Sequence, residues 1–260
     1  MPNVLDCSNI DSTITSLEPL LGLSNKTIRE ILVAFDSQAY SNAHPDDSRH
    51  LKEFLPVLLR QQGASNNNPD FAYWFHGTRV LDPGTLGLGL KPLNQQIDQL
   101  WQDLFQLAQS WVDGKEWQAF RVKVETVDPL ESSKLFRRRL SNSIDWGPHA
   151  VLIRDSIATP DPDVEWNYLS GPETITDLCD SFLCHYGQDL LAKFREQSVP
   201  CIVKFKDRCH RTDLVGNALA YVYSALHNEP FFTCNACFES EGKAVPSDAI
   251  VDVEKLSNDR

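Results

Sequence analysis

The sequence comprises 260 residues, of which 42% are hydrophobic and 10% aromatic, and this is enough for a packed core. Its 36 acidic and 24 basic side chains give a net charge of −12, which argues against stable binding to duplex DNA, because phosphate backbones attract basic surfaces. No apolar run approaches the roughly 20 residues that span a bilayer, so no membrane partner is expected.

Two amphipathic helices are predicted near the N-terminus, over residues 26–40 and 49–62, because apolar side chains recur there at helical spacing. A polar connector rich in asparagine follows at residues 63–69. The sequence therefore predicts a helical N-terminal extension, residues 1–68, and a main domain, residues 69–260.

The main domain combines predicted strands and helices. Short aromatic or β-branched runs indicate strands, and apolar residues at i, i+3, i+4 and i+7 indicate helices. The predicted strands cover residues 71–75, 117–124, 149–154 and 199–205, with two or three more within 230–256, and the predicted helices cover 94–112, 172–194 and 212–227. Strands scattered among helices predict an α+β fold.

A possible functional motif closes the first of these strands, where residues 75–79 read Phe-His-Gly-Thr-Arg. The motif resembles the first core strand of the ADP-ribosyltransferase superfamily, in the branch that contains diphtheria toxin and the poly(ADP-ribose) polymerases. The resemblance implies a split β-sheet core that binds NAD as its substrate. His76 would then donate a hydrogen bond to a ribose hydroxyl, Gly77 would let the backbone approach the nicotinamide amide, and Thr78 would fix the neighbouring turn or ribose. Arg79 would reach the NAD diphosphate or, alternatively, form a surface salt bridge.

The same resemblance implies an aromatic side chain that stacks on nicotinamide, and Tyr168 is the candidate. It follows the segment Thr-Pro-Asp-Pro-Asp at residues 159–163, which resembles a turn often seen in the family. The Gly-x-Tyr strand that usually precedes that turn is missing, and residues 151–154 read Val-Leu-Ile-Arg instead. Packing of Tyr168 in the core is the alternative interpretation.

A catalytic carboxylate is expected on a late strand, and Glu239 and Glu241 are the candidates. Alternation along a strand would place both on one face. Residues 245–254 resemble the closing strand of the superfamily. By the resemblance, one carboxylate would stabilise positive charge on the ribose as the nicotinamide bond breaks, and Glu241 is favoured because it is the second of the pair. A Glu-x-Glu pair is typical of the arginine-modifying branch, and two solvated carboxylates on a strand edge are the alternative.

The seven cysteines are an odd number without the spacing of a disulfide framework. Cys234 and Cys237 have the spacing of half a zinc site, but Cys209 and His210 are adjacent and complete it poorly, so no metal is expected. The N-terminus also lacks the pattern of a signal peptide. We expect a cytoplasmic protein with reduced thiols, or an effector delivered without a cleaved signal.

Taken together, these patterns predict an enzyme that transfers ADP-ribose from NAD to a macromolecular acceptor, either protein or nucleic acid. A bacterial or phage toxin or effector would fit the size of the chain by analogy. The alternatives are an NAD glycohydrolase, an inactive ADP-ribosyltransferase fold used for binding, and an RNA phosphate-transferring relative. The N-terminal helices would pack on the core or bind a neutralising or regulatory protein partner.

Overall fold

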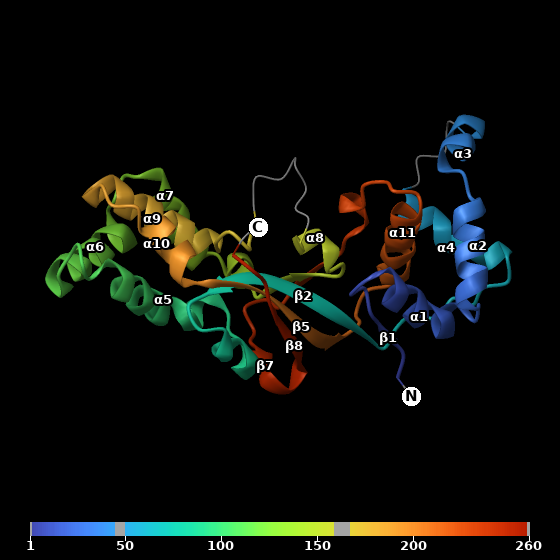
Figure 1. Cartoon of the computed structure of the whole chain (residues 1–260), viewed down its shortest axis with the longest axis horizontal. Coiled ribbons are helices and arrows are strands. Elements are labelled where there is room, and N and C mark those ends of the chain that lie inside the picture. The colour runs from blue at the N-terminus through green and yellow to red at the C-terminus, as the bar shows by residue number, and fades with distance from the viewer. Residues whose placement is uncertain (1, 45–49, 159–166, 259–260) are drawn as a thin grey trace. The chain divides into compact units, whose positions relative to one another are not determined.

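A computed structural model describes residues 2–44, 50–158 and 167–258 (Figure 1). The chain combines runs of consecutive helices with a sheet whose pairs β2–β4 and β5–β8 are antiparallel, so the expected α+β class is confirmed. Within the described ranges, no helix has the length and apolar character needed to cross a membrane.

The chain forms two compact units. Unit 1 comprises Met1–Phe75, Val151–Asp163 and Lys206–Phe238, and unit 2 comprises His76–Ala150, Val164–Phe205 and Glu239–Arg260. The expected division was an N-terminal extension followed by one domain. In the structure, each unit is instead assembled from three separate stretches of sequence.

The main sheet has the strand order β6-β4-β2-β5-β8, with β1 paired to β2. Its strands are β1 (Val4–Leu5), β2 (Phe71–Val80), β4 (His149–Val151), β5 (Val199–Arg208), β6 (Cys237–Glu239) and β8 (Ile250–Lys255). Phe75 pairs with Val151 in antiparallel register, and Cys201 pairs with Lys255. The predicted strand at 71–75 is real but continues for five residues, so the His-Gly-Thr motif lies inside β2 and does not close it. The predicted strand at 149–154 ends early, at Val151.

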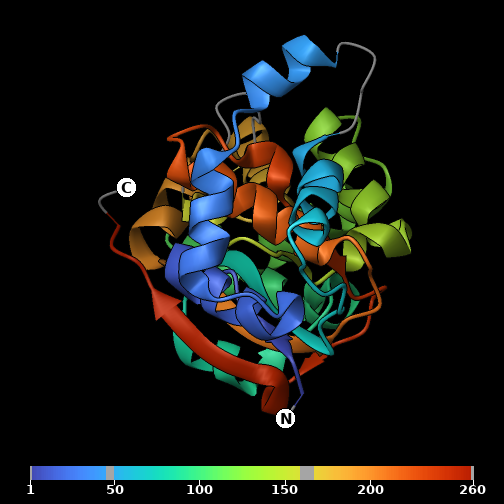
Figure 2. The same cartoon turned by 90° about the vertical axis from the view of Figure 1, so that its right-hand side faces the viewer.

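Unit 1 is built around the buried helix α11 (Leu214–Leu226). It packs against α1 (Ile10–Leu21), α2 (Asn25–Ala34) and α4 (Leu51–Gln61), as Figure 2 shows. Gly216 permits this packing, because a Cβ atom there would collide with the carbonyl oxygen of Lys52 on α4. The N-terminal helices therefore share a core with residues far along the chain. The short helix α8 (Asp155–Ala158) also belongs to this unit.

The helix predicted over residues 26–40 is divided into α2 and α3 (Ser37–Ala43). Phe35 leaves the helical conformation, and the side chain of Asp36 then accepts a hydrogen bond from the backbone of Ala39. This bond caps a new helix, and an aspartate at such a position is a common start signal.

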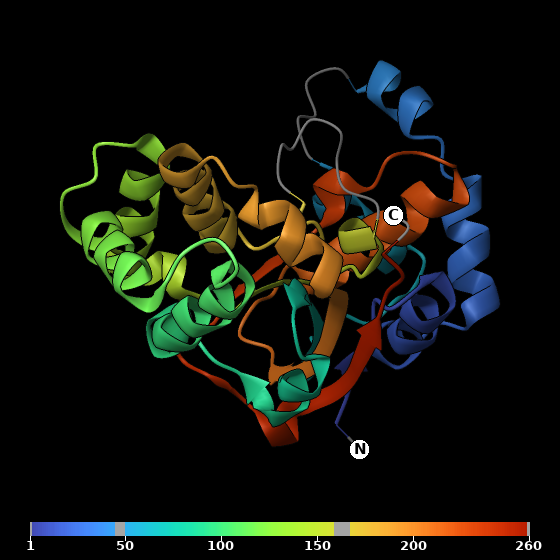
Figure 3. The same cartoon turned by 60° about the vertical axis from the view of Figure 1, so that its left-hand side comes forward.

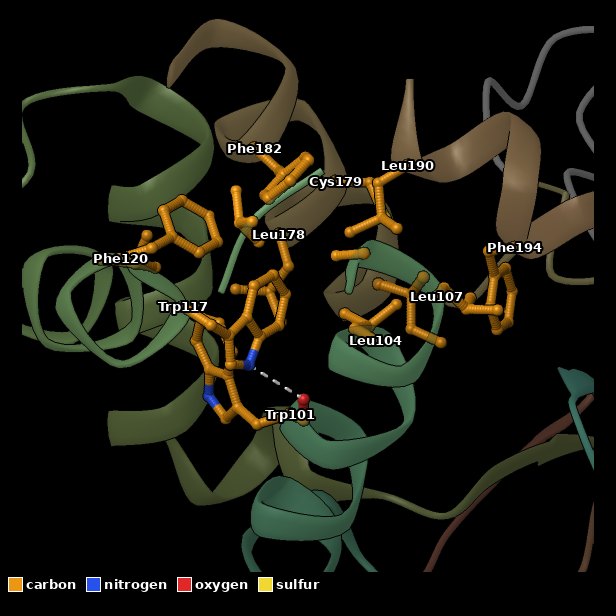
Figure 4. Close-up of a cluster of buried hydrophobic side chains, with 14 of the residues drawn as sticks. Trp101, Leu104, Leu107, Trp117, Phe120, Leu178, Cys179, Phe182, Leu190 and Phe194 are labelled. Carbon is orange, nitrogen blue, oxygen red and sulfur yellow. Dashed lines mark hydrogen bonds between the residues drawn. The ribbon is translucent and has the colours of Figure 1, made fainter. Parts of the chain in front are cut away.

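Unit 2 contains a group of five helices (Figure 3). They are α5 (Leu93–Ala108), α6 (Gly114–Thr126), α7 (Glu131–Ser141), α9 (Glu173–Tyr186) and α10 (Leu190–Gln197). Their core is rich in aromatic side chains, and Trp101, Trp117 and Phe182 lie in it together (Figure 4). The indole nitrogen of Trp117 donates to the carbonyl oxygen of Trp101 at 3.2 Å, so the polar group of this buried ring is satisfied.

Residues 117–124 form part of helix α6, so the predicted strand there is wrong. Asp113 and Glu116 form a capping box at the start of the helix, in which each side chain accepts from the other's backbone. Trp117, Phe120 and Val124 then face the core at helical spacing. The predicted helix at 172–194 is divided into α9 and α10, because Gly187 adopts a left-handed conformation with φ of 67°.

The tail carries the expected short strands. β7 (Val245–Pro246) pairs with β3 (Gly89–Leu90) in a second, two-stranded sheet. Four short 3-10 helices complete the described chain: η1 (Pro83–Leu88), η2 (Ser143–Trp146), η3 (Phe232–Cys234) and η4 (Ser247–Ala249).

Candidate functional site

His76 lies on β2 and is half-buried. Its Nδ1 atom is 2.6 Å from the carbonyl oxygen of His149, at the start of the neighbouring strand β4. A carbonyl oxygen can only accept, so Nδ1 carries the hydrogen. Desolvation by burial lowers the pKa of His76 and outweighs the hydrogen bond to the His149 backbone, which raises it, so the ring is neutral near pH 7. Nε2 is then a hydrogen-bond acceptor, so in this state neither ring nitrogen of His76 is free to donate to a ligand.

The sheet brings Glu239 to the same end of β4 as His76. The backbone nitrogen of Leu152 donates to the carbonyl oxygen of Ala236 at 2.9 Å. Because the strand residues of β4 precede Leu152 and those of β6 follow Ala236, the two strands run in opposite directions. The end of β6 at Glu239 therefore lies beside the start of β4 at His149. Two strand spacings separate β2 from β6, which amounts to roughly 10 Å.

Glu241 lies outside the strands, in a turn after β6. Glu241 and Gly242 both have positive φ angles, 54° and 74°, so the alternation that would place Glu239 and Glu241 on one strand face does not apply. The turn packs on Trp146, since a Cβ atom at Gly242 would lie 3.1 Å from Cε3 of that ring. Trp146 precedes His149 by three residues, so the turn is held near the start of β4.

Both glutamate side chains are exposed to solvent. Glu241 forms an ion pair with Lys243 at 3.3 Å, and both of these side chains are more than three-quarters exposed. Exposed pairs of this kind are weak and do not fix a side chain. We call His76, His149, Glu239 and Glu241 the His76 cluster.

Gly77 and Thr78 continue β2 beyond His76. Thr78 is buried within the strand and has no turn beside it, so one of its expected roles, fixing a neighbouring turn, does not apply. The glycine for which the structure does require a close backbone approach is Gly89, with φ of 109°, where a Cβ atom would lie 2.6 Å from the carbonyl oxygen of Val245.

Arg79 has different neighbours from His76. Side chains three residues apart on a strand point to opposite faces, so the two side chains leave β2 on opposite sides. The Arg79 side chain is buried, and its two terminal nitrogens donate to Oδ1 of Asn258 at 2.6 and 3.3 Å. Arg79 lies on the opposite face of β2 from His76, so the expected contact with a ligand held by His76 does not match its position. The alternative, a salt bridge at the surface, does not match either, because the side chain is buried.

Tyr168 lies in a turn and is 46% exposed, so the alternative in which it packs in the core is wrong. The turn expected at residues 159–163 lies outside the described residues. Two residues after Tyr168, the carbonyl oxygen of Ser170 accepts a hydrogen bond from Nε of Arg195 at 2.8 Å.

The cysteines are free thiols, and Cys234 is buried whereas Cys237 is exposed. In residues 2–44, 50–158 and 167–258, no group of three or more histidine, cysteine or acidic side chains is arranged to hold a metal ion. A small pocket of about 70 Å³ lies in unit 1, lined by α4, the loop at residues 65–68 and the start of α11. It contains none of the predicted site residues.

Two residues of the site were not singled out from the sequence. His149 contributes its backbone carbonyl, which any residue could supply, so only the pairing of β2 with β4 reveals it. Trp146 supports the Glu241 turn through a ring that sequence alone would assign to a core. No protein family, curated protein or solved structure matches the chain.

Proposed function

We propose that the chain is an NAD-dependent ADP-ribosyltransferase of the split-sheet type, and that NAD binds at the His76 cluster. One observation supports this proposal: the hydrogen bond to His149 fixes His76 in one tautomer, with Nε2 unprotonated, beside the start of β4, where β6 ends at Glu239 and leads into the turn of Glu241. A fixed acceptor suits the diol of a ribose, which has hydroxyl hydrogens to donate.

The chemistry is the cleavage of the bond between nicotinamide and C1′ of the ribose. Nicotinamide leaves with the bonding electron pair, and positive charge develops on C1′ and the ring oxygen, as in glycoside hydrolysis. A carboxylate next to the ribose stabilises that charge. The acceptor's nucleophile then forms a bond to C1′ and loses its proton to solvent.

We assign the ribose carboxylate to Glu241 and an acceptor-side role to Glu239. The weak pair with Lys243 leaves Glu241 free to turn toward a ligand, and its turn is anchored on Trp146. Glu239 sits at the end of β6, at the rim of the same cluster. The acceptor is a macromolecule, either protein or nucleic acid.

The deciding experiment measures nicotinamide release and acceptor labelling side by side with labelled NAD and cell lysate. Glu241→Gln should abolish both, at a cost of about 3–4 kcal/mol in barrier, whereas Glu239→Gln should spare release and impair labelling. Glu196→Gln, an exposed glutamate on α10, is the matched control and should retain both activities. Digestion of the labelled fraction with protease or nuclease identifies the class of acceptor.

The other outcomes separate the competing functions. Nicotinamide release with no labelled acceptor would mean that water is the acceptor and the enzyme is a glycohydrolase. NAD binding without release, unchanged by either substitution, would identify a binding module. Absence of NAD binding would remove the proposal.

A further inference from the structure

Among the residues that the structure describes, Arg79 is a buried cation without a counter-ion. The residue is only 6% exposed, and the two hydrogen bonds that its side chain makes with described residues both go to one neutral acceptor, Oδ1 of Asn258. Its Nε atom is buried and has no hydrogen-bond partner, and no carboxylate of the described residues forms an ion pair with it. Buried charges in proteins are normally paired, because desolvation costs several kcal/mol.

Two strands bring further polar groups to Arg79. The backbone nitrogen of Cys209, after β5, donates to the carbonyl oxygen of Asp70, before β2, so these strands run antiparallel and the end of β2 lies beside the start of β5. There Cys201 pairs with Lys255 of β8. Asn258 follows β8 by three residues and closes over Arg79.

Two more cations lie around this place. The pKa of Arg79 is lowered by burial first and then by the positive charge of Arg195. Burial raises the pKa of the Cys201 thiol, and the charges of Lys255 and Arg79 partly oppose that rise. The positive charge of Arg195 also opposes the rise that burial causes in the pKa of Asp180, but the two side chains form no ion pair among the described residues. The charges of Lys255 and Arg79 therefore act on the neutral Cys201 thiol, and the charge of Arg195 acts on Arg79.

We propose that Arg79, Arg195, Lys255 and Asn258 form a binding site for a phosphate group. An arginine presents several N–H donors in a fixed fork that matches the oxygens of phosphate, and the unused Nε–H of Arg79 is one such donor. The amide nitrogen of Asn258 supplies a further donor while its oxygen holds the guanidinium. This site lies on the opposite side of β2 from His76, so it does not depend on the proposed enzymatic function.

The test is calorimetric titration of the full-length protein with inorganic phosphate and with pyrophosphate, against chloride at equal ionic strength. Binding should weaken by about tenfold or more in Arg79→Met, as expected for loss of charge-assisted hydrogen bonds. Arg195→Met and Asn258→Ala should each weaken it too. Arg138→Met, which removes an exposed arginine on α7, should leave it unchanged.

Circular dichroism of each variant separates loss of binding from loss of folding, and Arg79→Lys is the second variant if Arg79→Met does not fold. Lysine keeps the charge and loses the fork, so binding should weaken without disappearing. Asp259→Asn tests whether that carboxylate competes for the site, in which case phosphate should bind more tightly to the variant. Equal binding by wild type and both Arg79 variants, or no binding beyond that of chloride in wild type and Asp259→Asn, would overturn the proposal.

Discussion

At the scale of single residues, His76 shows how a backbone contact sets side-chain chemistry. The carbonyl oxygen of His149 fixes the proton on Nδ1, and burial keeps the ring neutral. Sequence identified the histidine but not its tautomer, because the partner is a main-chain atom on another strand. The proposed role of His76 follows from that partner and not from the motif alone.

The first prediction is the pH dependence of nicotinamide release. The pKa of His76 is lowered from its ordinary value of 6.5, so Nε2 stays unprotonated at and somewhat below that pH. We expect kcat/KM to hold steady as pH falls from 8 through 6.5 and to decline only at more acidic pH, when protonation removes the acceptor. His76→Gln retains an acceptor oxygen that does not titrate, so its slower rate should lack this decline. A wild-type decline centred above pH 6.5 would contradict the assigned state of His76.

A second prediction at this scale concerns Gly216, where α4 and α11 meet. A methyl group there would collide with the Lys52 carbonyl oxygen, and backbone cannot move as a flexible side chain does. We expect Gly216→Ala to lower the free energy of unfolding by about 1–3 kcal/mol or more, measured as a shift of the urea midpoint. Gly87→Ala is the control, since nothing lies within 4 Å of its added atom. Equal midpoints for the two variants would show that the helices can separate freely.

At the scale of elements, the sequence located most helices and strands but misjudged α6. The run at 117–124 is rich in aromatic and β-branched residues, which favours a strand. Its start signal, Asp113 followed by Glu116, favours a helix, and the capping box decides the outcome. Core contacts of Trp117 and Phe120 then stabilise the helical form. Short apolar runs fit both periodicities, so only the cap could have distinguished them.

The third prediction tests this cap. Asp113 accepts hydrogen bonds from the backbone nitrogens of Lys115 and Glu116. Asp113→Ala should lower the free energy of unfolding by about 1 kcal/mol, visible as a lower Tm, whereas Asp113→Asn should retain most of the stability because its oxygen still accepts. A Tm for Asp113→Ala equal to that of wild type would mean that core packing alone determines α6.

The fourth prediction concerns a buried network that joins α6, α7 and α9. Asp128 is buried, and its carboxylate accepts from Ser133 Oγ at 2.7 Å and from His185 Nε2 at 2.8 Å. Desolvation alone would raise the pKa of Asp128, but the hydrogen bonds from His185 and Ser133 outweigh it and lower the pKa. The stability from this group is therefore present above pH 3.8 and is lost as pH falls through the lowered value.

Asp128→Asn should lower the free energy of unfolding at pH 7 by about 1–3 kcal/mol, because a neutral amide oxygen accepts hydrogen bonds more weakly than a carboxylate does. Urea titrations from pH 7 to pH 2 should show the gap between wild type and variant narrowing below pH 4. Asp248→Asn, an exposed aspartate, serves as the control and should track wild type throughout. A gap that stays constant down to pH 2 would show that the charge of Asp128 contributes nothing.

At the scale of the whole molecule, sequence predicted the class of fold but not which segments pack together. The helices predicted at 26–40, 49–62 and 212–227 each follow from their own periodicity, whereas α1 was not predicted. Their packing into one core depends on Gly216 and on apolar helix faces, and the sequence of such a face does not indicate which other helix it contacts. In the same way, Glu239 and His76 come to the same end of the sheet only because of the strand order β6-β4-β2, and local sequence patterns do not reveal that order.

The last prediction follows from this shared core. Every residue of α11 from Leu214 to Ser224 is buried, and α1, α2 and α4 provide much of its cover. A chain that begins at residue 69 would expose this apolar helix to water. We expect it to aggregate or to bind a hydrophobic dye, and to lose the cooperative unfolding transition of the full chain.

Within the intact chain, Leu59→Ala on α4, which removes a fully buried side chain, should lower the free energy of unfolding by about 2–5 kcal/mol. Val33→Ala on α2, where the side chain is 57% exposed, should cost less than about 0.5 kcal/mol. A soluble fragment 69–260 that unfolds cooperatively would show instead that the first 68 residues are an independent extension.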